Sequence, residues 1–148
     1  MLKKIMLMLT LAPLMSCMWV DHFDVSDRLN DEELEFIKTK KTLVSQYDYL
    51  LENNLFTEKD FYSPAFFRLK AEKRIEIYLK MFPNMNEDDK KLITNKYIYN
   101  GVEKLWVLAI LGPPISKSES AGGFDTWYYA KDRHIQFHQG LMVSDQGS

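Results

Sequence analysis

Apolar residues recur at helical spacing through the first part of the chain. Within residues 31–53 they stand three, four or seven positions apart, at Leu34, Ile37, Val44, Tyr47 and Leu51. This period is typical of an amphipathic helix with one buried face. Asn30, followed three residues later by Glu33, predicts a capping box at the start of this helix, and Asn53-Asn54 predicts its end.

Further helices are predicted from residue 57 onward. Thr57 with Asp60 is a typical helix start, and so is Ser63-Pro64, because proline suits the first helical position. A long helix after Pro64, closed by Pro83, would carry one apolar stripe formed by Phe67, Ala71, Ile75, Tyr78 and Phe82.

Two more helices are predicted on either side of Gly101. Asn86 with Asp89 starts the first, over 87–96, with acidic residues in its first turn. The second lies in YIYNGVEKLWVLAILGPP, which is apolar on most sides, so we expect it to be the most buried helix. Gly112 is placed to end it in a left-handed cap, and Pro113-Pro114 prevents its continuation.

The apolar period changes to two after residue 123. The segments FDTWYYA, RHIQFH and LMVSD each alternate and predict three short strands, the last two joined by a two-residue turn at Gln139-Gly140. Their buried positions are Trp127, Tyr129, Ile135 and Phe137. The Ser- and Gly-rich stretch before them is expected to be a solvated loop. The predicted fold class is α+β: N-terminal helices, then two helices packed on a three-stranded antiparallel β-meander.

The N-terminus has the pattern of an export signal. Lys3 and Lys4 precede an apolar run over 5–14, which is too short to span a bilayer of roughly 20 helical residues. The run ends in LMSC, which resembles the lipobox of bacterial lipoproteins and marks Cys17, the only cysteine, for lipidation. The predicted organisation is a signal peptide over 1–16, a tether over 17–30, a helical extension over 31–83 and an α+β domain over 84–148.

Charge and the residues after Cys17 bear on location and partners. The formal net charge of −2 shows no basic footprint for nucleic acid, so no nucleic-acid partner is expected. Met18 stands where an aspartate commonly signals inner-membrane retention in enteric bacteria. The expected location is therefore the outer membrane, lipid-anchored through acylated Cys17, with the protein on the periplasmic face.

Residues 98–144 resemble the SmpA/OmlA, or BamE-like, family of small bacterial outer-membrane lipoproteins. The matching positions, in order, are Ile98, Gly101, Val107, Leu111, Gly112, Pro114, Trp127, Tyr129, Phe137 and Gly140. The resemblance implies a fold like one repeat of β-lactamase inhibitory protein. It also implies an accessory role in outer-membrane protein assembly or envelope integrity.

The candidate catalytic and metal-binding residues do not form a recognisable motif. Ser116, Ser118 and Ser120, with His134 or His138 and Asp125 or Asp132, include the residue types of a hydrolase triad, but no G-x-S-x-G motif is present. Two histidines four residues apart on a strand stand about 13 Å apart, too far to share one zinc ion. No enzymatic activity, cofactor, metal site or small-molecule substrate is therefore predicted.

Protein binding is the remaining function class. The aromatic residues clustered over 56–67 form either a local core or an exposed patch, in which Tyr62 and Phe66 would meet a partner. Ser118 and Phe124, in the loop before the strands, are further candidates for docking. The favoured function is a non-enzymatic lipoprotein that binds another envelope protein. The alternative is an inhibitor or sensor module that binds a soluble periplasmic protein.

Overall fold

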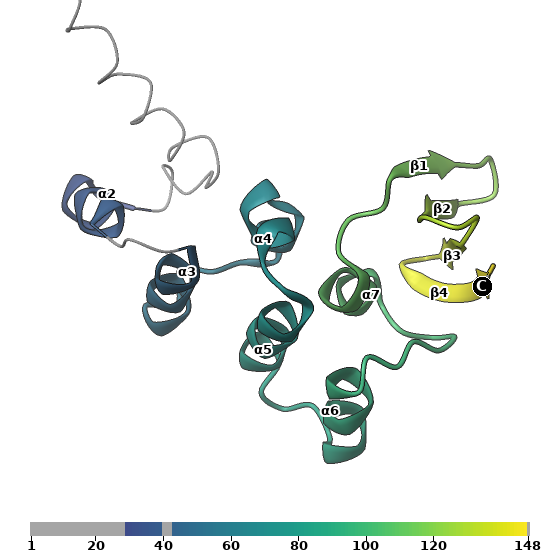
Figure 1. The fold of residues 1–148 in the computed structure, drawn as a ribbon, viewed down its shortest axis with the longest axis horizontal. Coiled ribbons are helices and arrows are strands. Elements are labelled where there is room, and N and C mark those ends of the chain that lie inside the picture. The colour runs from purple at the N-terminus through teal and green to yellow at the C-terminus, as the bar shows by residue number, and fades with distance from the viewer. Residues whose placement is uncertain (1–28, 40–42, 148) are drawn as a thin grey trace, which may run out of the picture. The chain divides into compact units, whose positions relative to one another are not determined.

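The computed structural model describes residues 29–39 and 43–147. The predicted signal peptide, Cys17 and the tether as far as residue 28 lie outside the described residues. The chain divides into two compact units, one ending at Ala65 and one beginning at Phe66. Helices come first and an antiparallel sheet last, so the α+β class is confirmed (Figure 1).

Between residues 29 and 53, the described part of the first unit has two α-helices where the sequence predicted one. Helix α2 (Asp31–Lys38) and helix α3 (Leu43–Glu52) are separated by residues 40–42, which lie outside the described residues. The predicted capping box is confirmed, because the Asn30 amide donates to Glu33 Oε2 at 3.0 Å and the Glu33 amide to Asn30 Oδ1 at 2.9 Å. The predicted stop is confirmed by Asn54, whose φ of 55° ends α3. The side chains of Leu34, Ile37 and Val44 lie outside the described part of the structure.

Aromatic side chains form the core of this unit. Tyr47, Phe56 and Phe61 are buried, with the Phe56 ring 5.5 Å from that of Tyr47 and 5.2 Å from that of Phe61. The Tyr47 hydroxyl lies 3.0 Å from Ser63 Oγ. Phe61 belongs to a 3-10 helix, η1 (Glu58–Tyr62). This helix starts after Thr57, as predicted. Of the two readings of the aromatic cluster, the local core therefore accounts for these three rings.

The predicted long helix after Pro64 is in fact two helices. Helix α4 (Pro64–Arg68) begins at proline as predicted, and α5 (Ala71–Met81) follows after a break at Leu69 and Lys70. Lys70 is extended, with φ −67° and ψ 154°. The apolar period continues across this break, so the pattern alone could not reveal it.

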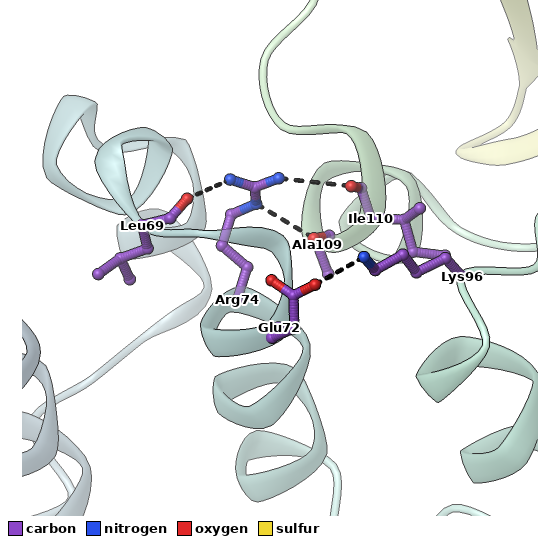
Figure 2. A network of polar contacts seen from close by, with 6 residues as sticks. All are labelled: Leu69, Glu72, Arg74, Lys96, Ala109 and Ile110. Carbon is purple, nitrogen blue, oxygen red and sulfur yellow. Dashed lines mark hydrogen bonds and ion pairs between the residues drawn. The ribbon is translucent and has the colours of Figure 1, made fainter.

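Arg74 binds a main-chain oxygen at the break between α4 and α5. Arg74 is 8% exposed, and its guanidinium donates hydrogen bonds to the main-chain oxygens of Leu69, Ala109 and Ile110 (Figure 2). The break leaves the Leu69 oxygen free of a helical partner, and the other two oxygens belong to the last turn of the helix that ends at Leu111, where carbonyls have no helical donor. Burial lowers the pKa of Arg74. One side chain thus joins α5 to that helix end.

Helix α6 (Glu87–Thr94) and helix α7 (Lys104–Leu111) follow. The predicted Asn86 cap is confirmed by the Asp89 amide, which donates to Asn86 Oδ1 at 2.8 Å. All residues from 105 to 110 in α7 are buried, as expected of the most apolar helix. Gly112 has the predicted positive φ of 76°, but its ψ of −159° is extended rather than left-handed helical. That region of backbone space is essentially restricted to glycine.

The sheet has four strands, where the sequence predicted three. They are β1 (Ser116–Glu119), β2 (Phe124–Tyr128), β3 (His134–His138) and β4 (Leu141–Gln146), antiparallel in the order β1-β2-β3-β4. Strand β1 was predicted as loop, because SKSE contains no apolar residue and all four positions are exposed. It exists through its pairing with β2 at the edge of the sheet. The predicted turn at Gln139-Gly140 is confirmed, with φ of 52° and 81°.

Helix α7 lies between α5 and the sheet in this unit (Figure 1). On the sheet side, Lys104 forms an ion pair with Asp125, and its ammonium lies 5.9 Å from the Trp127 ring centre. The Tyr129 hydroxyl donates to the Gly112 oxygen at 3.1 Å. Helix α5 packs on α7, and both lie in the compact unit that begins at Phe66.

In the described part of the chain, no helix has the length and apolar character needed to cross a bilayer.

Candidate functional site on the outer face of the sheet

The two faces of the sheet differ in what covers them. Trp127, Ile135, Phe137 and Met142 point to the inner face and are buried. No described element of this unit covers the opposite side, which we call the outer face (Figure 1). By register, its positions are Ser116, Ser118, Phe124, Thr126, Tyr128, His134, Gln136, His138, Leu141, Ser144 and Gln146.

The outer face contains no Asp, Glu, Lys or Arg at these positions of β1 to β4. The charged residues of the strands lie at the alternate positions, which share the side of Trp127. They are Lys117, Glu119, Asp125 and Asp145. Asp145 pairs there with Arg133 through two hydrogen bonds of 3.0 and 2.7 Å, and this contact raises the pKa of Arg133. A solvated sheet face usually carries both polar and charged residues; this one carries polar residues, while the charged ones lie at the alternate positions.

Rings and polar groups alternate across the outer face. The Phe124 and His138 rings stack with centres 4.5 Å apart, and Leu141 pairs with His138 on the next strand. In a second row, Tyr128 lies 3.3 Å from Ser118 Oγ through its hydroxyl and 6.1 Å from the His134 ring. These side chains offer apolar area together with hydrogen-bonding groups, which is the composition of protein interfaces rather than of bulk surface.

Among the large apolar side chains of the outer face, Tyr128 and Leu141 remain well exposed, at 41% and 49%. A β-bulge between Gln136 and Phe137 shifts the register with β4 and leaves Val143 exposed as well. Phe124 and the two histidines are half-buried by their neighbours. The outer face is therefore an ordered surface with protruding phenol and aliphatic groups.

The structure places the predicted docking residues in different settings. Ser118 and Phe124 both lie on the outer face, Ser118 in β1 and Phe124 at the start of β2. Tyr62 is 43% exposed and belongs to the first unit. Phe66 is 0% exposed, so the expectation that it meets a partner is corrected: its ring is core. Cys17 lies outside the described residues.

In the candidate triad that uses Asp125, the acid and the histidines lie on opposite faces of the sheet. Asp125 lies on the inner side of the sheet and pairs with Lys104, whereas His134 and His138 point to the outer face. His134 Nε2 lies 3.1 Å from Gln146 Oε1, and Ser118 contacts Tyr128. Over residues 29–39 and 43–147, no three His, Cys, Asp or Glu side chains gather as metal ligands would.

Comparison with protein-family models, with curated proteins and with solved structures gives no match for this chain.

Sequence reasoning missed Tyr128, His138 and Leu141 as surface residues of one site. The alternation along the strands could have identified them. Every second residue from Phe124 to Tyr128 and from His134 to His138 is uncharged. The alternation could not have shown that β1 extends this face, because nothing in SKSE indicates a strand.

Proposed function

We propose that the chain is a non-enzymatic lipoprotein of the bacterial envelope whose C-terminal unit binds another envelope protein through the outer face. The observation that carries the proposal is the absence of charged side chains from these strand positions, combined with exposed Tyr128 and Leu141. Interface cores are depleted of charge and enriched in tyrosine. A sheet face that stays in water would gain no stability from the absence of charged side chains.

The partner we propose is a folded envelope protein that offers an uncharged, partly apolar surface of its own. A charged partner surface would lose its hydration without finding ionic partners at these positions, which disfavours it. The seryl, glutaminyl and imidazole groups of the outer face can hydrogen-bond to polar groups at such an interface.

The location follows from the sequence of the N-terminus. The lipobox-like LMSC would place fatty acyl chains on Cys17, and several chains give firm anchoring where one alone is marginal. The resemblance of residues 98–144 to BamE-like lipoproteins supports the outer membrane, its periplasmic face and an accessory role in barrel assembly or envelope integrity.

The outer face is tested by photocrosslinking in intact cells. A photoreactive benzoyl-phenylalanine replaces Tyr128, and as a matched control it replaces Lys91, an exposed residue of α6. We expect a discrete crosslinked band at position 128 and none at position 91. Recovery of an integral barrel protein or assembly factor supports the proposal. A soluble periplasmic protein supports the inhibitor or sensor alternative, and equal crosslinking at both positions contradicts a role for the outer face.

The anchor is tested separately. The Cys17→Ala variant should lose incorporation of labelled palmitate and leave the membrane fraction, while Ser16→Ala, which keeps a small residue before the cysteine, should keep both. Unchanged labelling of Cys17→Ala would remove the lipoprotein assignment but would leave the outer face intact as a binding surface.

A further inference from the structure

An open pocket lies away from the outer face, where the end of α5 meets the start of α7. Its volume is about 390 Å³, within the roughly 300–1,000 Å³ typical of small-molecule sites. Its lining residues are Tyr78, Met81, Phe82, Pro83, Met85 and Glu103, together with Asn84. The walls are thus mainly thioether, aromatic and proline groups, and one carboxylate interrupts them.

Glu103 is held in place rather than freely mobile. The Tyr78 hydroxyl donates to Glu103 Oε1 at 2.6 Å, and Tyr78 itself is buried, with its ring 6.0 Å from that of Trp106. Glu103 is also the residue that precedes the first turn of α7, and its main chain pairs with Leu141. Helix N-termini favour a nearby carboxylate, which suits the position of Glu103.

The carboxylate of Glu103 still has capacity for a ligand. Among the described residues, no Lys or Arg side chain forms an ion pair with Glu103; the neighbouring Lys104 pairs instead with Asp125. Burial and the nearby carboxylates of Glu103 and Asp89 raise the pKa of Tyr78, which identifies the surroundings of this phenol as acidic. Asp89 is itself occupied by Asn86 and Tyr99.

We propose that this pocket binds a small organic cation that carries an ammonium group on an apolar body. The ammonium would form a charge-assisted hydrogen bond to Glu103, and the aromatic side chains of Tyr78 and Phe82 line the same pocket. Met81 and Met85 have flexible, polarisable side chains that adapt to an aliphatic or aromatic body. An anionic ligand is disfavoured by the same carboxylate. The inference does not depend on the outer face or on lipidation.

The test compares three probes of equal length on the full chain with methionine methyl groups labelled by ¹³C. Hexylammonium, hexanol and hexanoate differ only in the head group. We expect hexylammonium to shift the Met81 and Met85 methyl signals in a saturable manner, with an affinity at least roughly tenfold above that of hexanol, and hexanoate to bind least. Equal binding of hexylammonium and hexanol would overturn the proposal without any mutant.

Two matched variants test whether the charge of Glu103 binds the ammonium group. Glu103→Gln keeps an oxygen that accepts the Tyr78 hydroxyl but removes the charge, and it should lower hexylammonium affinity roughly tenfold or more. Glu76→Gln makes the same change on α5 at an exposed residue paired with Lys73 and Lys80, and it should leave affinity unchanged. Unchanged binding in Glu103→Gln, or an equal loss in both variants, would overturn the proposal.

Discussion

Replacing Arg74 with methionine tests how the C-terminal unit is held together. Methionine keeps an unbranched stem of similar length but removes the guanidinium. The oxygens of Leu69, Ala109 and Ile110 then lose their donor (Figure 2). The nearby Gly112 amide cannot replace it, since that amide already donates to the Leu108 oxygen.

The expected loss follows from these three contacts. Hydrogen bonds from a charged donor contribute about 1.5–3 kcal/mol each. The bonds to Leu69 and Ala109 count in full, and the longer bond of 3.3 Å to Ile110 contributes less. Burial of the guanidinium opposes them, and it is relieved in the variant. We therefore expect Arg74→Met to lower the free energy of unfolding by about 3 kcal/mol.

The neighbouring residue Glu72 supplies a matched control on the same helix. Glu72 pairs with Lys96 at 2.7 Å, and both side chains are largely exposed. The contact lowers the pKa of Glu72, but water and salt screen an exposed pair, so Glu72→Gln should leave the unfolding midpoint unchanged. Each variant removes one charge from α5, a buried positive charge in Arg74→Met and an exposed negative charge in Glu72→Gln.

The assay is equilibrium unfolding in urea, followed by tryptophan fluorescence, because Trp106 and Trp127 both lie buried in this unit. A loss below about 1 kcal/mol for Arg74→Met, or an equal loss for Glu72→Gln, would refute the assignment of Arg74 as the link between α5 and α7. Arg74→Lys should fall between wild type and Arg74→Met, since one ammonium cannot reach all three oxygens.

The remaining predictions concern the sheet core and the buried phenols. Trp127→Ala should lower the free energy of unfolding by about 3–5 kcal/mol, because its ring is 2% exposed and packs 4.7 Å from that of Phe137; a loss under about 1 kcal/mol in the same urea assay would contradict this packing. Burial raises the pKa of Tyr129, so stability from this group is fully present below about pH 10, where an unfolded phenol ionises, and is lost as pH rises further. Unfolding midpoints measured between pH 8 and pH 11.5 should therefore fall only above about pH 10, and Tyr129→Phe should flatten that fall; a fall that is equally steep in the variant would assign it to other groups.

Local signals in the sequence predicted the parts of the fold that depend on neighbouring residues. The capping box at Asn30, the cap at Asn86, the proline start of α4 and the turn at Gln139-Gly140 are all confirmed. Each uses hydrogen bonds or backbone preferences within a few residues, so the chain carries the information at that point. The alternation in β2 and β3 likewise placed Trp127 on the buried face.

Contacts between distant segments decided the rest. The break at Leu69 and Lys70 lies within a continuous apolar period, and it is stabilised through Arg74 by carbonyls 35 and 36 residues away. The cluster of aromatic residues over 56–67 is compatible with either a local core or an exposed patch, and only tertiary packing shows that Phe66 is completely buried.

The sequence by itself determined the α+β order of elements and the side of β2 and β3 that faces the core, because these depend on composition and period. Only the tertiary structure decided that SKSE becomes a strand, since an exposed polar segment takes that form when β2 offers it a register. It also decided that Ser118 and Phe124 share the outer face with Tyr128, and that Tyr78 meets Glu103 at the apolar pocket. Such sites join residues that are far apart in the chain, and no local pattern encodes their distance in space.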